Sequence, residues 1–155
     1  MVPQWSAGEE VLAQQFPLVV PVQVRFRDLD ALGHVNNAVY LSYLEMARVA
    51  YVQSRFGLSH PRDFSFILAR VEIDYKSPVT LGERLMVGIG VAHVGKRSFR
   101  FAYEIREASS GRLVAQAETV QVMYDYQAQK PVAIPEEVRR VLEADRVSVP
   151  GGEEA

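Results

Sequence analysis

The sequence lacks several features that would point to particular classes of protein. It contains no cysteine, which excludes disulfide bonds, a thiolate nucleophile and cysteine-ligated metals. No apolar stretch approaches the roughly 20 residues that a membrane-spanning helix needs. Residues 1–16 have no basic segment, and Glu9 and Glu10 stand where a signal peptide would be apolar. These absences predict a cytoplasmic protein without membrane insertion.

The chain also lacks a surplus of basic residues. Its formal net charge is −2, so nothing offsets the phosphate backbone of a nucleic acid, and we expect no nucleic-acid partner. Its 155 residues, of which 48% are hydrophobic, suffice for one domain with a core and are short for two.

The spacing of apolar residues predicts the order of the elements. Residues 20–27 end in an alternation of apolar and polar side chains, which is typical of a half-buried strand. Residues 38–56 have helical spacing and no Gly or Pro, with Asn36 or Asn37 as the N-cap and Gly57 as the C-cap. The remaining predicted elements are strands at 66–76, 85–91, 98–106 and 113–124, and a last helix from Pro135.

Two of these segments indicate how the elements pack. The helix at 38–56 has apolar residues over most of its circumference, which predicts that it is buried. A long antiparallel sheet curled around this one central helix, with a short C-terminal helix, accounts for the pattern and gives an α+β fold. In the strand at 113–124 the apolar phase switches after Ala117, which predicts a bulge near Glu118 and Thr119. Gly88 and Gly90 predict that one face of their strand meets another surface closely.

The densest group of polar residues lies between the first strand and the long helix. Residues 28–37 contain two carboxylates, a glycine, an imidazole and two amides. A helix N-terminus presents unpaired N–H groups and positive partial charge, which can stabilise a developing oxyanion. A carboxylate in the adjoining loop is then close to an electrophile bound there. The segment therefore has the outline of an acyl-transfer site.

Residues 27–40 resemble the signature of hotdog-fold acyl-CoA thioesterases, and most of all that of the 4-hydroxybenzoyl-CoA thioesterase-like branch. Residues 71–83 resemble the second-strand pattern of the same family, and the likeness covers about residues 18–128. It implies a single hotdog domain at 18–145, with a lead-in at 1–17 and a flexible tail at 146–155. Residues 33–37 differ from the aromatic-rich stretch of the 4-hydroxybenzoyl enzyme and look more like the branch that acts on short or medium acyl-CoA.

The resemblance also implies an activity and an assembly. The activity is hydrolysis of an acyl-CoA thioester to free coenzyme A and a carboxylic acid, without a metal or other cofactor, coenzyme A being part of the substrate. The second aspartate of the motif, Asp30, is then the catalytic carboxylate, as nucleophile or general base, and the backbone amide of Asn37 polarises the thioester carbonyl. The family forms homodimers, often paired again into tetramers, with active sites at the subunit interface.

Each candidate in the motif also has a structural interpretation. We favour catalysis for Asp30 over a role as a cap that accepts backbone N–H groups. His34 either binds the substrate, orients Asp30 or is a structural histidine. Gly33, Asn36 and Tyr40 are candidates for substrate contact, while a tight turn, a helix cap and a place in an aromatic core explain them equally well.

Two further groups of candidates lie outside the motif. Some hotdog thioesterases place their catalytic glutamate on the long helix, which makes Glu45 the second candidate. Because a buried carboxylate needs a partner, an ion pair of Glu45 to Arg48 or to a partner subunit is the favoured alternative. Lys96, Arg97 and Ser98 form a basic hairpin suited to the phosphates of coenzyme A, although a solvated turn explains them as well.

Other chemistries fit the sequence less well. There is no Gly-x-Ser-x-Gly segment for a serine hydrolase. Asp28, Asp30 and His34 have no downstream cluster of further ligands, so no metal site is predicted. The remaining alternative is a non-catalytic hotdog module that binds acyl-CoA or acyl-carrier protein. Asp30 favours the enzyme, because a binding module needs no carboxylate beside the carbonyl.

Overall fold

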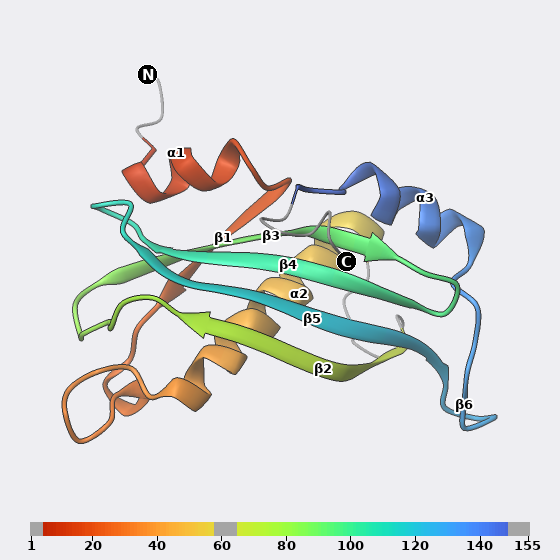
Figure 1. Cartoon of the computed structure of the whole chain (residues 1–155), viewed down its shortest axis with the longest axis horizontal. Helices are drawn as coiled ribbons and strands as arrows, with labels where there is room; N and C mark the ends of the chain where they lie inside the picture. Colours follow the sequence, from red (N-terminus) through yellow and green to blue (C-terminus); the bar gives the residue numbers. More distant parts are fainter. Residues whose placement is uncertain (1–4, 58–64, 149–155) are drawn as a thin grey trace.

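One antiparallel sheet curls around a single long helix, α2 (Figure 1). The computed structural model describes residues 5–57 and 65–148. The arrangement confirms the predicted α+β fold with a central helix and a short C-terminal helix. In the order of the sheet the strands are β1 (Leu18–Gln23), β3 (Arg84–Val94), β4 (Ser98–Glu107), β5 (Leu113–Asp125) and β2 (Phe66–Tyr75), and the short β6 (Lys130–Pro131) pairs with the end of β5. The helices are α1 (Ala7–Ala13), α2 (Tyr40–Phe56) and α3 (Glu136–Ala144).

The core lies between α2 and the inner faces of β3 and β4. Tyr51 of α2 packs edge-on against Phe101 of β4, with the ring centroids 4.9 Å apart. The burial of alternate side chains holds α2 diagonally across the sheet. The inward-facing residues of the two central strands that are at most 1% exposed are Leu85, Val87, Ile89, Val91, Phe99, Phe101 and Ile105.

Helix α2 is buried on one side only. Tyr43, Leu44 and Ala47 are at most 2% exposed, whereas Met46 and Val49 on the opposite side are 48% and 43% exposed. The prediction of an all-round buried helix was therefore wrong for the single chain, because the sheet covers only one face of α2.

The first strand is shorter than predicted. β1 ends at Gln23, and a 3-10 turn, Phe26–Asp28, takes the place of its predicted last residues. The turn forms because the Asp28 carboxylate accepts a hydrogen bond from the backbone N–H of Arg25 at 2.9 Å. Phe26 is consequently 80% exposed instead of alternating into the core.

The predicted bulge is not found near Glu118 and Thr119; the pairing of β4 with β5 shifts between Ile105 and Arg106, far from these residues. The pairing of β2 with β5 shifts between Leu68 and Arg70, while β5 keeps one inward phase through the buried residues Thr119 and Gln121. The prediction of a bulge near Glu118 and Thr119 was wrong, because it assumed that Val120 and not a polar residue faces the core. The bulge in β2 also moves Phe66 and Leu68, rather than Ile67 and Ala69, into register with the inward residues of β5.

The outer face of the sheet carries α1, an element absent from the prediction. Ser6 and Glu9 form a capping box, a signal that was present in the sequence. A Cβ atom on Gly88 would lie 2.6 Å from Cδ2 of Phe16, which confirms that this face of β3 meets another surface closely. Gly88 therefore makes room for Phe16 and Leu12 of the N-terminal segment, and Gly90 makes room for Val147 and Pro17.

The predicted flexible tail begins too early. Val147 donates a backbone hydrogen bond to Val91 at 2.9 Å, and Arg146 forms a parallel bridge with the same residue. Residues 146–148 thus lie against β3, because β1 starts beyond this point and leaves that edge free. The rest of the predicted tail, 149–155, lies outside the described residues.

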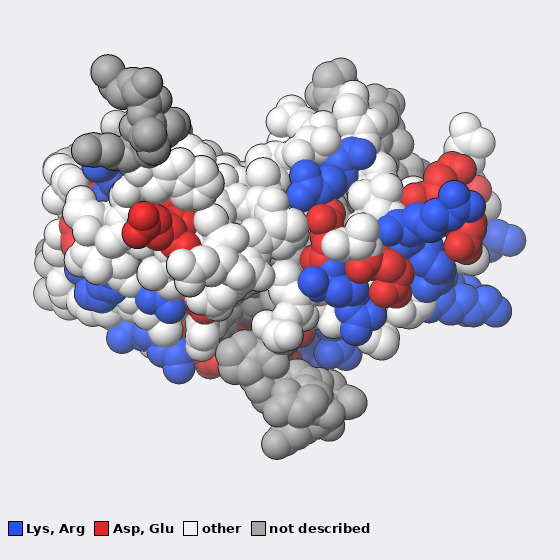
Figure 2. Space-filling model, turned by 90° about the horizontal axis from the view of Figure 1, so that it is seen from above, with Lys and Arg blue, Asp and Glu red and all other residues white. Residues whose placement is uncertain are grey.

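The described surface carries charges of both signs. In Figure 2, Lys and Arg lie interspersed with Asp and Glu over α3, whose exposed residues include Glu136, Glu137 and Arg140. None of the helices in the described ranges is long and apolar enough to cross a membrane.

We expect Gly88→Ala to destabilise the protein by about 1–3 kcal/mol, because its Cβ collides with the ring of Phe16. In the double variant with Phe16→Ala the collision is absent, so the two changes should cost less together than the sum of their single effects. Urea unfolding of the four proteins measures this coupling. Additive effects would contradict the packing described for α1.

Candidate active site

The motif between β1 and α2 folds into a tight turn centred on Asp30. The Asp30 N–H donates to the His34 carbonyl at 2.7 Å, and Asp30 Oδ1 accepts from the N–H groups of Leu32 and His34 at 2.9 and 3.2 Å. Gly33 has φ +80°, a value that favours glycine. Asp30 is exposed, and its Oδ2 accepts no hydrogen bond from the described residues. One carboxylate oxygen thus caps the turn while the other is available to a ligand.

Asp28 anchors this turn to the helix. Its carboxylate is buried and accepts from the Tyr43 hydroxyl at 2.8 Å, in addition to the Arg25 N–H. Its carbonyl accepts from the Asn36 N–H at 2.8 Å. Burial by itself would raise the pKa of Asp28, but these hydrogen bonds and the charge of Arg25 lower it overall. Asp28 thus joins the turn to α2 through buried hydrogen bonds.

The N-terminus of α2 presents a free amide. Asn36 is the cap, and its Oδ1 accepts from the Ala38 N–H at 2.9 Å. A 3-10 turn, Asn37–Val39, follows, so α2 itself begins at Tyr40 and not at Ala38 as predicted. Among the described residues no group accepts a hydrogen bond from the Asn37 N–H. This amide is free to bind a ligand oxygen.

The side chain of Tyr75 fixes the orientation of that peptide. Its hydroxyl donates to the Asn37 carbonyl at 2.7 Å, and its ring packs edge-on against Tyr40 at 5.1 Å. Tyr40 is 2% exposed, and burial raises the pKa of its phenol. Tyr40 thus belongs to the aromatic core beneath the site. Sequence reasoning did not identify Tyr75, although it lies within the second segment that resembles the family pattern.

The imidazole of His34 has no hydrogen-bond partner among the described residues, and its side chain is half-buried. The contacts of His34 with Asp30 are made by its backbone, which also forms a bridge with Thr80. The side chain therefore does not orient Asp30 within one chain.

Glu45 differs from the expectation in two ways. It is exposed, so the premise of a buried carboxylate was wrong. It also forms no ion pair with Arg48, whose Nη1 instead donates to the Tyr103 hydroxyl at 3.2 Å. The reason is helical geometry: residues three apart here fall on different sides of the boundary between the buried and exposed faces of α2.

The basic hairpin lies at the other end of the sheet from the motif. Lys96 and Arg97 are exposed at the turn between β3 and β4, and Ser98 begins β4. The motif joins the opposite end, where Val35 donates to the Val79 carbonyl at 2.9 Å. The ten residues of β4 span about 30 Å between these ends. Within one chain the hairpin and the motif are not brought together.

An ion-pair clamp supports the loop on which the motif rests. Arg112 donates to Glu83 Oε2 at 2.9 Å, to the Pro78 carbonyl at 3.1 Å and to Ser77 Oγ at 3.1 Å. The hydrogen bond from Arg112 lowers the pKa of Glu83. No sequence signal links residues 29 positions apart, so this clamp could be found only in the tertiary structure.

With this geometry in place, the comparisons with known proteins identify the family. The Thioesterase-like superfamily matches residues 24–142. The chain belongs to this hotdog superfamily. It is 30% identical over 124 residues to the long-chain acyl-CoA thioesterase FadM of Escherichia coli, covering 79% of this chain and 94% of the relative. It is 28% identical over 135 residues to a 1,4-dihydroxy-2-naphthoyl-CoA hydrolase of Nostoc punctiforme, covering 84% and 89%.

A solved relative agrees with this assignment. The structure of a thioesterase from Thermus thermophilus complexed with coenzyme A and Zn superposes with a TM-score of 0.77 at 39% identity, covering 84% of this chain and 95% of that one. In the present chain, residues 5–57 and 65–148 contain no group of three or more His, Asp or Glu side chains that could hold a metal ion.

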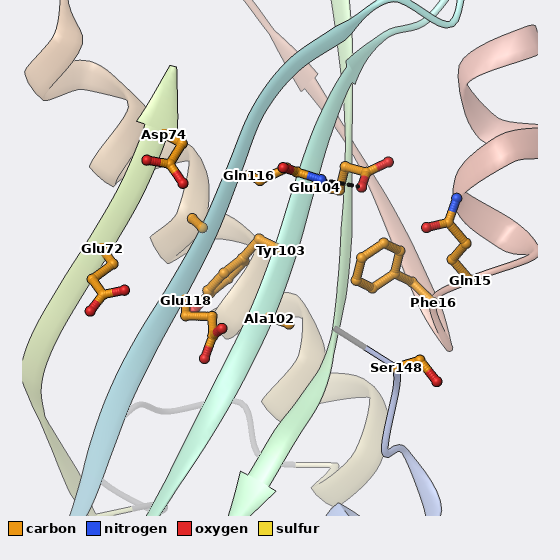
Figure 3. A pocket seen from close by; sticks show the side chains of 11 residues that line it. Gln15, Phe16, Glu72, Asp74, Ala102, Tyr103, Glu104, Gln116, Glu118 and Ser148 are labelled. Carbon is orange, nitrogen blue, oxygen red and sulfur yellow. Dashed lines mark hydrogen bonds between the residues drawn. The ribbon is translucent and has the colours of Figure 1, made fainter. Parts of the chain in front are cut away.

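A separate depression lies on the outer face of the sheet. Figure 3 shows Glu72, Asp74, Glu104 and Glu118 around it, with Phe16 at its rim. Glu104 pairs with Arg106 at 2.6 Å. Because α2 and the motif lie on the inner face, this depression is not part of the candidate active site.

We expect the unfolding free energy to fall in acid. The lowered pKa values of Asp28 and Glu83 mean that their ionised forms favour the folded state. That contribution is complete above the ordinary carboxyl range and is lost as the pH falls through the folded-state values. Tyr43→Phe removes a donor to Asp28, so it should lower stability at pH 7 by about 1–3 kcal/mol and weaken the pH dependence.

Urea unfolding between pH 3 and pH 7 measures both effects. Tyr126→Phe is the matched control, because this tyrosine is 58% exposed. If Tyr43→Phe matched the wild type in stability and pH dependence, the anchoring role of Asp28 would be wrong.

Proposed function

We propose that the protein hydrolyses an acyl-CoA thioester to free coenzyme A and a carboxylic acid. The observation that carries the proposal is the pairing of a carboxylate oxygen without a partner, Asp30 Oδ2, with a free amide at the start of α2, that of Asn37. The names of the curated relatives support acyl-CoA as the substrate class.

In this mechanism the thioester carbonyl lies over the Asn37 N–H. The amide and the positive end of the 17-residue helix α2 stabilise the negative charge that develops on the carbonyl oxygen. In one route Asp30 attacks the carbonyl carbon, the C–S bond breaks to release the coenzyme A thiolate, and water hydrolyses the resulting mixed anhydride to the carboxylic acid. In the other route Asp30 takes a proton from the water that attacks the carbonyl carbon, the C–S bond breaks, and the thiolate is protonated as it leaves. The His34 imidazole, which is half-buried and has no hydrogen-bond partner among the described residues, can hydrogen-bond the substrate beside Gly33 and Asn36. No metal or prosthetic group takes part, and coenzyme A enters as part of the substrate.

We propose further that two copies join through β2. This strand is an edge of the described sheet, pairs only with β5, and leaves Leu68 and Tyr75 45% and 42% exposed. Free edge strands of this length are rarely left uncovered. Antiparallel pairing of two β2 strands would form one continuous sheet and an active site at the subunit interface.

The same pairing gives the basic hairpin a role. A two-fold axis through the centre of β2 brings the Phe66 end of one strand beside the Tyr75 end of the other. Lys96, Arg97 and Ser98 lie at the first end and the motif at the second. We therefore propose that the hairpin of one copy binds the phosphates of the coenzyme A whose thioester lies at Asp30 of the other copy.

Asp30→Asn tests the catalytic proposal. The amide oxygen of asparagine can still accept the two backbone hydrogen bonds of the turn, so we expect an intact fold and a loss of turnover of about 100-fold or more. Thiol release from a panel of acyl-CoAs measures this loss. Glu45→Ala is the control and should retain activity.

A fully active Asp30→Asn protein would overturn the catalytic role of Asp30. If the wild type binds the acyl-CoA panel but releases no thiol, the protein is instead a binding module.

Leu68→Glu tests the assembly. Because Leu68 is 45% exposed in the single chain, a carboxylate there should leave the fold intact and oppose pairing of two β2 strands. Analytical ultracentrifugation should show a smaller species than for the wild type, and thioesterase activity should fall with it. Trp5→Glu, at another exposed apolar residue, should retain the wild-type assembly. An unchanged assembly of Leu68→Glu would contradict pairing through β2.

A further inference from the structure

A network of polar side chains lies inside the core, between α2 and the sheet. Arg48 of α2 donates to the Tyr103 hydroxyl at 3.2 Å, and this hydroxyl is 2.6 Å from Thr119 Oγ1. The Gln121 amide nitrogen also donates to Thr119 Oγ1. Arg48 is 7% exposed, and Thr119 and Gln121 are fully buried. Four polar side chains from three elements thus meet in the core, at inward-facing positions that usually carry apolar residues.

This network is incompletely satisfied by the described residues. Gln121 Oε1 is buried without a hydrogen-bond partner among them. None of the described carboxylates forms an ion pair with Arg48, and of its five N–H groups only one bond, to Tyr103, is formed. If the network served only to attach α2 to the sheet, apolar residues in its place would avoid the desolvation cost of burying polar groups. The spare acceptor and the spare donors are therefore available to a ligand.

The network lies beside an apolar strip that starts at the candidate active site. Gln121 and Thr119 pair in register with Leu68 and Val71 of the edge strand β2, and Leu68 is 45% exposed. On α2, Leu41 lies two turns before Arg48 on the same side of the helix and is 42% exposed. An acyl group that extends from the Asn37 amide between α2 and β2 would meet these apolar side chains first and the polar network next.

The distance between the Asn37 amide and Arg48 sets the length of acyl group that can reach the polar network. Arg48 follows Asn37 by eleven positions, which corresponds to about 16 Å along the helix axis. A single aromatic ring attached to the thioester carbonyl spans less than half of this distance. An extended aliphatic chain of medium or greater length can reach Arg48.

We propose that Arg48, Tyr103, Thr119 and Gln121 form a specificity subsite for an aliphatic acyl group that carries a hydroxyl at its far end. A hydroxyl is both donor and acceptor, so it can donate to Gln121 Oε1 and accept from an Arg48 N–H at the same time. A carboxylate would pair with Arg48 but offers no proton to Gln121, and a methyl group would leave both unpaired. The proposal rests on the proposed function and names the substrate class of that site.

The test compares ω-hydroxyacyl-CoAs with unsubstituted acyl-CoAs of equal chain length, from octanoyl to hexadecanoyl. For the wild type we expect kcat/KM to favour the hydroxylated substrate by about tenfold or more at the longer lengths, since a site that hydrogen-bonds a substrate hydroxyl discriminates against the analogue without it. ω-Carboxyacyl-CoAs form the third arm and should react more slowly than the hydroxylated series. A wild-type ratio near one, or a preference for the carboxylate, would overturn the proposal.

Gln121→Met and Arg48→Met keep the approximate volume of each side chain and remove its hydrogen bonds. Each should bring the ratio of kcat/KM for the hydroxylated substrate to kcat/KM for the unsubstituted one towards one. Val122→Ala, at a neighbouring residue of β5 that faces outward, is the matched control and should keep the wild-type ratio. Thermal unfolding of each variant verifies the fold, and a ratio that both methionine variants leave unchanged would contradict the subsite.

Failure of the subsite and failure of the proposed function give different results. If no acyl-CoA is hydrolysed, calorimetric titration with non-hydrolysable thioether analogues of the two series measures the same preference as a ratio of Kd values. If unsubstituted acyl-CoAs are hydrolysed and the ratio is one, the thioesterase function stands and the subsite does not.

Discussion

The buried carboxylate of Asp28 is the contact on which the candidate site depends. It accepts hydrogen bonds from Arg25 in the turn after β1 and from Tyr43 on α2, while its carbonyl accepts from Asn36. A buried carboxylate without these donors would carry a large desolvation cost. The same bonds therefore stop β1, set the start of α2 and position the Asp30 turn. The position of the candidate catalytic carboxylate, Asp30, therefore depends on the hydrogen bonds of a second carboxylate, Asp28.

The single chain leaves two surfaces incomplete, and both border the site. The edge of β2 has no partner among the described strands, and α2 is covered by the sheet on one face only. An edge strand and a half-exposed apolar helix are each costly to leave in water. Their positions explain why the motif and the basic hairpin, at opposite ends of one sheet, suit two copies in antiparallel contact.

The polar residues in the core of β5 are explained better by substrate specificity than by stability. Thr119 and Gln121 occupy the inward phase of β5, where a purely structural strand would have valine or isoleucine. Their neighbours Val120 and Val122 face outward instead. β5 therefore buries polar instead of apolar side chains next to Arg48. The proposed subsite explains these residues, because they would bind the hydroxyl of the substrate.

The sequence by itself determined the order of the five long strands, the central helix, the last helix and the motif at the start of α2. These follow from periodicity, caps and glycines, which act over a few residues and so are visible in a linear pattern. The choice of Asp30 and of the Asn37 amide as candidates came from the resemblance to the thioesterase signature. Local signals do not distinguish a cap from a catalyst, and Asp30 caps a turn with one carboxylate oxygen while the other has no partner among the described residues.

Only the tertiary structure decided which residues face the core where the pattern was ambiguous. The bulge at Leu68 and Arg70, the inward phase of Thr119 and Gln121, the exposure of Glu45 and the clamp of Arg112 on Glu83 all depend on partners distant in sequence. Burial depends on what lies opposite a residue, and an ion pair depends on two chain segments that meet. Neither is encoded in the spacing of a single segment, because both are properties of the contact between segments.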